Sequence, residues 1–179
     1  MNKKLIILHN NIGDYMYYFN IFFLFSMLGH FIENIFYTSK DSGILFGWWT
    51  PIYGIGVVTI ILVYNFVIRK IKVNKYIKFF LVFTINAILL SVLELVGGIL
   101  IEKVFHITFW DYSKDPFSIF RYTSLKMALI WGISGIGVTF ILKPIIDKIV
   151  KYIPRFITYI LITLFSIDCI LTIIPYMTK

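Results

Sequence analysis

The chain has 179 residues, of which 59% are hydrophobic and 19% aromatic, and its formal net charge at pH 7 is +8. This apolar fraction exceeds that of ordinary soluble domains, so the composition excludes a soluble globular protein and indicates one integral membrane domain over residues 1–179. The basic residues lie in short segments between apolar stretches rather than in one patch, which argues against nucleic acid as a partner.

Five apolar segments have about the 20 residues that a helix needs to cross the hydrocarbon core of a bilayer. Backbone polar groups cannot stay unpaired in lipid, so each segment is expected to be helical. The first segment is expected to be retained, because the apolar stretch after Lys3 and Lys4 is too short for a cleavable signal peptide. The sequence therefore predicts an all-α fold, a polytopic bundle of about five transmembrane helices. The predicted spans are residues 15–37, 51–68, 79–101, 125–142 and 156–176.

The distribution of lysine and arginine predicts the orientation of the chain. The N-terminal tail and the linkers after the second and fourth spans contain 11 of the 17 basic residues, and the opposite side contains 6. Because cytoplasmic segments carry the excess of basic residues, we expect a cytoplasmic N-terminus. With five spans, the C-terminus is then outside, and the protein is a multi-pass protein of a cell membrane.

Four acidic residues lie within or at the end of apolar segments. Glu33 is near the end of the first span, Glu94 and Glu102 are in and just after the third, and Asp168 is in the fifth. These three spans run in the same direction, so the four carboxyl groups are expected on one side of the membrane, the extracytoplasmic side in the orientation above. A carboxylate inside a membrane-length helix is costly and usually has a function.

Structural explanations remain open for several of these residues. Glu33 and Glu102 also fit interfacial acids that reach water or headgroups, and Asp168 fits a hydrogen bond to a neighbouring helix. His30 shares a helix face with Glu33 and fits a structural hydrogen bond better than a metal ligand. Packing alone explains Glu94 less well, because a small residue would pack there without the charge penalty.

The connections between spans carry further signals. Residues 102–124 are rich in Phe, Trp and Tyr, which predicts an interfacial or re-entrant loop. In that loop, His106, Trp110 and Asp111 could line a mouth above Glu94, although an aromatic belt that contains a turn is the alternative. On the opposite side, residues 143–155 are predicted to form a short basic amphipathic helix on anionic headgroups. A small-residue stripe in the fourth span predicts a packing seam. It consists of Ala128, Gly132, Gly135 and Thr139.

Several catalytic and nucleotide-binding motifs are missing from the sequence. It contains no Walker A motif, no HExxH or CxxC metal spacing, no GxSxG elbow and no dinucleotide-binding fingerprint. We therefore predict no catalytic residue, no metal and no cofactor, and an enzymatic activity is the less favoured possibility.

Short motifs are distributed over most of the chain. They are GHFIE at 29–33, GILFG at 43–47 followed by PIYGIG at 51–56, Leu93-Glu94, Gly98, Glu102, WDYS at 110–113, Pro116 and Trp131-Gly132. Together, over about residues 22–141, they resemble the bacterial family of putative ABC-transporter permeases, also called putative ABC-transporter type IV. The resemblance implies a membrane protein with a role in transport that works with a separate ATPase subunit.

The chain departs from the family pattern at three places. Family members often carry Trp where His30 stands and Gly-Pro where Gly47 is followed by Trp48. The Asn and Gly that often follow the WDYS-x-x-P segment are replaced within residues 117–121. If these positions shape a site, its specificity differs here.

Three hypotheses about function follow. The first is a permease-like or transport-associated protein, a homo-oligomer because five helices make a thin wall, whose carboxylate-lined pocket takes a cationic cargo or relays protons. The second is an intramembrane enzyme that acts on lipid or envelope substrates, with two acids in separate acid and base roles. The third is a non-catalytic accessory or immunity-type membrane protein. The candidate ligand-binding residues are Glu33, Glu94, Glu102, His30, Trp110, Asp111 and Tyr53.

Overall fold

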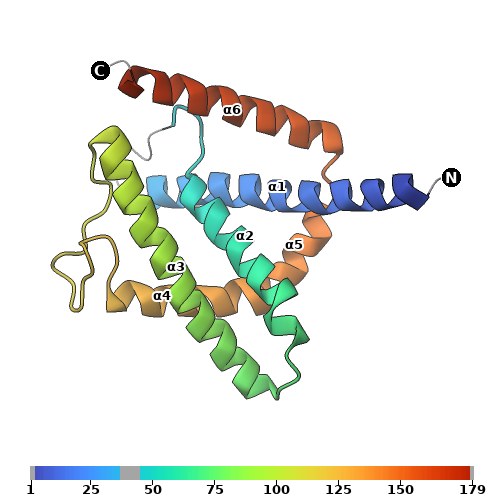
Figure 1. The fold of residues 1–179 in the computed structure, drawn as a ribbon, viewed down its shortest axis with the longest axis horizontal. Helices are drawn as coiled ribbons and strands as arrows, with labels where there is room; N and C mark the ends of the chain where they lie inside the picture. Colours follow the sequence, from blue (N-terminus) through green and yellow to red (C-terminus); the bar gives the residue numbers. More distant parts are fainter. Residues whose placement is uncertain (1–2, 37–44, 178–179) are drawn as a thin grey trace. The chain divides into compact units, whose positions relative to one another are not determined.

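The structure is a computed structural model that describes residues 3–36 and 45–177, with the side chains of residues 15–35 and 45–175. The part of the chain that it describes is helical and contains no strand, apart from one isolated bridge between Ile119 and Thr123. Figure 1 shows α1 (Lys3–Phe36), α2 (Pro51–Phe66), α3 (Lys75–Phe105), α4 (Leu125–Gly137), α5 (Lys143–Val150) and α6 (Arg155–Met177).

Five helical stretches are long and apolar enough to cross a membrane. The predicted all-α fold with five spans is therefore confirmed. The stretches are Tyr15–Ile35, Pro51–Lys70, Lys75–Phe105, Leu125–Val150 and Arg155–Pro175. Tyr37, the predicted end of the first span, lies outside the described residues, as do residues 38–44.

Local capping, rather than hydropathy, sets the ends of α3. The helix extends beyond the predicted 79–101 at both ends. At its start, the Asn74 side chain accepts a hydrogen bond from the Ile77 backbone N–H at 2.9 Å, which supplies an acceptor for one of the first helical amides. At its end, His106 adopts a left-handed conformation with φ 56° and donates its backbone N–H to the carbonyl of Glu102.

The fourth span is longer than predicted. After α4, a π-helical stretch from Val138 to Leu142 leads directly into α5, so that most of the predicted connection 143–155 is helical. Pro144 has no backbone N–H, so it interrupts the row of backbone hydrogen bonds along the helix. The π-helical stretch just before it accommodates this interruption. The predicted short helix is confirmed at Lys143–Val150. Its position on lipid headgroups stays a prediction.

The chain forms two compact units. The terminal unit contains the described residues up to Val58 and from Ile145 onward, and the central unit contains Thr59–Pro144. This division does not test the prediction of one membrane domain, which stays a prediction.

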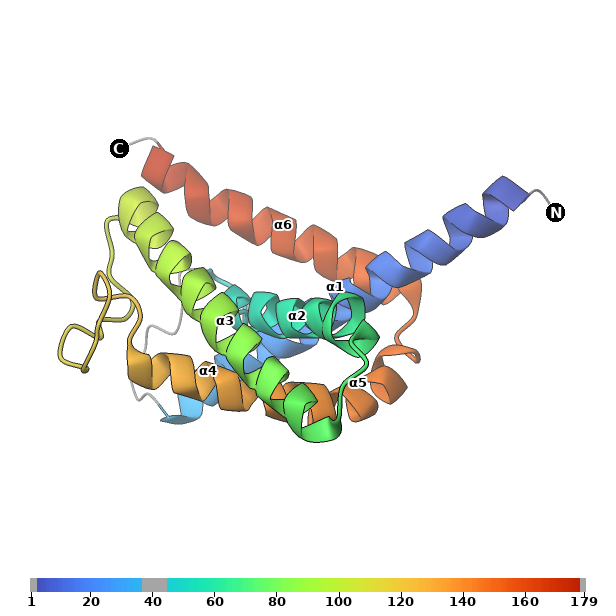
Figure 2. The same cartoon turned by 60° about the horizontal axis from the view of Figure 1, so that its bottom comes forward.

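In the terminal unit, α1 and α6 run in the same general direction in both ribbon views (Figures 1 and 2). The buried Thr158 hydroxyl of α6 donates to the Asn20 side-chain oxygen of α1 at 2.6 Å. Gly29 and Gly54 bring α1 close to the start of α2, because a Cβ at Gly29 would lie 2.4 Å from the Tyr53 ring. A Cβ at Gly54 would lie 2.3 Å from the Ser26 hydroxyl oxygen. Small residues therefore permit this helix contact.

In the central unit, α3 packs against α4 through the glycines of α4. A Cβ at Gly132 would lie 2.6 Å from the Phe83 ring, and a Cβ at Gly135 would lie 2.6 Å from the Cβ of Asn86. The packing seam that the small-residue stripe predicts is therefore confirmed at these two positions.

Candidate functional site

The seven candidate residues divide between the two units. His30, Glu33 and Tyr53 belong to the terminal unit. Glu94, Glu102, Trp110 and Asp111 belong to the central unit. A pocket that all seven share stays a prediction.

Glu94 is the buried carboxylate of the central unit. Its side chain is 4% exposed, and it lies on α3 among membrane-length apolar sequence. The Tyr112 hydroxyl donates to Oε1 at 3.1 Å, and the Trp131 indole N–H donates to Oε2 at 3.1 Å. Because both oxygens accept a hydrogen bond, part of the cost of burying the carboxylate is offset. Glu94 thereby links α3 to α4 and to the loop between them.

The same face of α3 holds a second residue of this loop. Gly98 lies one turn after Glu94, and a Cβ there would lie 2.4 Å from the Tyr122 ring, so the ring occupies the space that a side chain would fill. The Tyr122 hydroxyl donates to Glu102, one further turn along. The Arg121 guanidinium lies 3.8 Å from Glu102, but both side chains are about half exposed, so this ion pair adds little.

Trp110 and Asp111 shape the α3–α4 loop, residues 106–124. The Trp110 indole N–H donates to the Tyr122 carbonyl at 3.0 Å, which fastens the two arms of the loop to each other. The exposed Asp111 accepts the Ser113 backbone N–H at 2.8 Å in a local turn. Hydrogen bonds from the Ser113 hydroxyl and backbone hold the pKa of Asp111 below its ordinary value. Asp111 therefore acts as a turn residue, as the alternative interpretation of this loop expected.

Four non-glycine residues at the end of α3 and in this loop have a positive φ, a conformation that costs an L-residue of order 1–3 kcal/mol when the surroundings impose it. They are His106 (56°), Phe117 (54°), Phe120 (48°) and Arg121 (62°). The hydrogen bonds of Trp110, Tyr112 and Tyr122 hold the loop in this shape.

Glu33 is the candidate carboxylate of the terminal unit. Its Oε2 accepts the Thr50 hydroxyl at 3.2 Å, and the Thr50 backbone N–H donates to the Ser26 carbonyl at 3.0 Å. Within the described part of the chain, Thr50 is the one donor to this carboxylate. One turn earlier, Nδ1 of His30 is buried and has no hydrogen-bond partner among the described residues. Tyr53 packs its ring over Gly29 beside them.

Asp168 is one of the four acidic residues noted in the apolar segments, but it is not among the candidate ligand-binding residues. It lies on α6, is 8% exposed, and accepts the backbone N–H groups of Phe46 at 3.0 Å and Gly47 at 2.7 Å. The Trp49 indole N–H donates at 2.7 Å and the Thr172 hydroxyl at 3.2 Å. Asp168 therefore binds the segment before α2 rather than a neighbouring helix. A side chain at position 47 would crowd this site, because a Cβ at Gly47 would lie 2.8 Å from the Asp168 carboxylate.

The two buried carboxylates have the same chemical role. Each lies on a membrane-length helix and accepts hydrogen bonds from a connecting segment that includes an aromatic side chain. An ionised carboxylate has acceptors only, so several converging donors suit it. Among the described side chains, those of residues 15–35 and 45–175, no group of three or more His, Cys, Asp and Glu is arranged to hold a metal ion.

The comparisons with known proteins add one match. The family model described as Putative ABC-transporter type IV matches residues 20–173, a range that includes Glu33, Glu94 and Asp168. No curated protein and no solved structure matches the chain.

Proposed function

Because the chain belongs to the family described as Putative ABC-transporter type IV, we propose that it is a permease-like, transport-associated subunit of a cell membrane. The family match over residues 20–173 is the observation that carries this proposal. The sequence has no Walker A motif, so nucleotide hydrolysis comes from a separate ATPase subunit. Five helices make a thin wall around a transport pathway, which favours a homo-oligomer.

Glu33 is the best candidate for the residue that contacts the cargo. One of its oxygens accepts the Thr50 hydroxyl, and the other has no donor among the described side chains. Nδ1 of His30, one turn away, also has unused hydrogen-bonding capacity within that part of the chain. A carboxylate near the end of a membrane helix, with one oxygen that no described residue pairs, suits a cationic cargo or a proton relay. The excess of basic residues on the other side of the membrane supports an extracytoplasmic position for this group.

The candidate residues of the central unit suit a role in holding the α3–α4 loop rather than in contacting the cargo. The carboxylate oxygens of Glu94 accept hydrogen bonds from Tyr112 and Trp131, which supports a role in holding the α3–α4 loop. Glu102 and Trp110 hold the same loop through Tyr122. We therefore assign cargo contact to Glu33 of the terminal unit, and the holding of the α3–α4 loop to Glu94, Glu102 and Trp110 of the central unit.

Affinity purification of the full-length chain from its own membranes tests the proposal. The chain, crosslinked reversibly before extraction, is expected to bring with it a protein that carries a Walker A motif, and the complex is expected to hydrolyse MgATP. An equally abundant tagged membrane protein of another family serves as the control. Recovery of the chain without any nucleotide-binding protein would overturn the proposal.

A further inference from the structure

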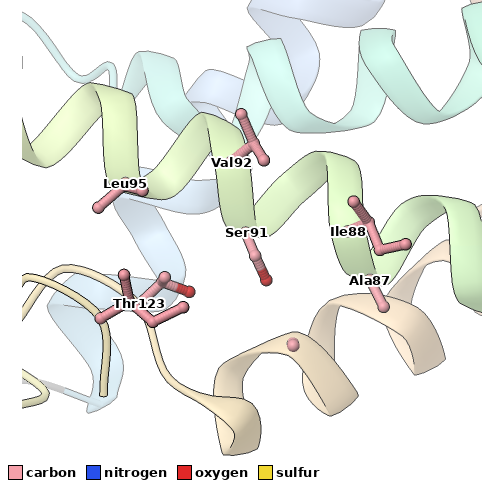
Figure 3. Close-up of a pocket in the computed structure, with 8 residues that line it drawn as sticks. Ala87, Ile88, Ser91, Val92, Leu95 and Thr123 are labelled. Atoms are coloured by element: carbon pink, nitrogen blue, oxygen red, sulfur yellow. The ribbon is translucent and has the colours of Figure 1, made fainter. Parts of the chain in front are cut away.

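The central unit has an apolar groove of about 270 Å³ between α3, α4 and the α3–α4 loop. Figure 3 shows Ala87 and Ser91 on the side of α3 that faces α4, and Thr123 at the loop end of the groove. Ala128 of α4 lines the opposite wall. The groove exists because these facing positions carry small side chains.

A strained turn builds the loop end of the groove. Ile119 and Thr123 both line it, and they form an isolated bridge in which the Ile119 N–H donates to the Thr123 carbonyl at 2.9 Å. Between them, Phe120 and Arg121 adopt positive φ angles, and Tyr122 is fixed by its contacts with α3. Strained backbone of this kind persists where the surroundings impose it, and it is concentrated at functional sites.

The surroundings of the groove favour hydrocarbon as its occupant. It lies along α3 within the candidate span Lys75–Phe105, where the medium is the acyl region of the bilayer. Two of its lining residues, Ile88 and Val92, are 62% and 49% exposed, so the groove is continuous with the outer surface of α3. An apolar cavity of about 150 Å³ holds one benzene molecule, so this groove has room for a hydrocarbon segment on the order of ten carbons.

We propose that this groove binds one acyl chain of a bilayer phospholipid. The loop turn at Ile119–Thr123 closes one end of the site, and the small side chains of Ala87, Ser91 and Ala128 provide its depth. A bound chain differs from the surrounding lipid because it fills a defined space between two helices and a fixed turn. The assignment does not depend on the transport function, since it concerns the central unit alone.

The test uses the full chain in vesicles of phosphatidylcholine and phosphatidylglycerol that contain a phospholipid with a photoactivatable acyl chain. Crosslinks in the wild type are expected at the groove-lining residues of α3 and at Ile119–Thr123. Ala87→Phe and Ala128→Leu fill the groove from opposite walls. Each is expected to reduce these crosslinks about tenfold, because lost burial of two methylene groups weakens binding by about that factor.

Val96→Phe is the matched control, since Val96 is 46% exposed on the same helix and does not line the groove. It is expected to keep the wild-type crosslinks. Thermal unfolding of each variant separates a filled groove from a misfolded chain, and the two filling variants are independent of each other. Unchanged crosslinks in both folded filling variants would overturn the proposal. So would a wild-type pattern in which the groove-lining residues carry no lipid crosslink.

Discussion

The hydroxyl group of Tyr112 lies 3.1 Å from Oε1 of Glu94, so an aromatic residue of a connecting loop hydrogen-bonds a carboxylate in the membrane-spanning part of α3. The indole N–H of Trp131 donates to the other oxygen of the same carboxylate. The carboxyl group of Glu94 thus holds a loop and two helices of the central unit together. This relationship assigns Glu94 to the residues that stabilise the central unit.

Glu94→Gln is expected to destabilise the protein. The amide keeps one acceptor oxygen but places an NH₂ group opposite one of the two donors, so about one buried hydrogen bond is lost, at a cost of about 1–3 kcal/mol. Thermal unfolding in mild detergent measures the effect. Glu102→Gln is the control and should change the midpoint less, because the Glu102 side chain is 41% exposed. An unchanged midpoint for Glu94→Gln would mean that the carboxylate does not hold the loop.

Gly98→Ala is expected to loosen the α3–α4 loop. The added methyl group would lie 2.4 Å from the Tyr122 ring, which must then move away from α3. Trypsin should therefore cleave after Arg121 faster than in the wild type. Gly137→Ala is a matched control, because a Cβ there meets nothing within 4 Å, and alanine favours the helix by about 0.5–1 kcal/mol. Equal cleavage rates in both variants would contradict the packing of Tyr122 on Gly98.

Asp168→Ala is expected to release the segment before α2. The substitution leaves the N–H groups of Phe46, Gly47 and Trp49 without their acceptor. Each buried donor that stays unpaired costs about 1–3 kcal/mol, so the segment should detach or the protein should unfold. Hydrogen exchange of the peptide that contains residues 45–50 should accelerate. Cys169→Ser changes the neighbouring residue and should leave this exchange unaltered, while slow exchange in Asp168→Ala would exclude the anchoring role.

Glu33→Gln should separate function from stability. The amide oxygen can still accept the Thr50 hydroxyl, so the unfolding midpoint should stay close to that of the wild type. Loss of the charge should reduce MgATP hydrolysis by the complex in vesicles from its own cells about tenfold, the factor that corresponds to about 1.4 kcal/mol.

Thr50→Val is the complementary variant, because it removes the hydrogen bond at this site and leaves the Glu33 carboxyl group unchanged. It keeps the charge, so hydrolysis should persist even if stability falls. Full hydrolysis by the Glu33→Gln variant would exclude Glu33 as the cargo-contacting residue.

The five spans could be predicted from the sequence because a membrane-length apolar segment has one way to pair its backbone groups. The ends of α3 could not, since they depend on a cap at Asn74 and a left-handed residue at His106. The glycine seam of α4 was visible because helical periodicity places Gly132 and Gly135 on one face.

The hydrogen-bond partners of the acidic residues could not be predicted from the sequence. Tyr112 reaches Glu94 through a loop whose backbone includes several residues with positive φ, and no periodicity predicts such a path. Trp49 and Asp168 are 119 positions apart, and only the folded terminal unit brings them together. Sequence reasoning therefore located the acidic residues in the apolar segments but not the side chains that hydrogen-bond them.

The most direct test of the proposed function is the mass of the complex extracted from its own membranes in native-lipid nanodiscs. We predict a particle that contains at least two copies of the 21.0 kDa chain together with nucleotide-binding subunits. A particle that contains this chain alone, as a monomer or an oligomer, under conditions in which known ABC transporters of the same membranes stay intact, would contradict the proposal.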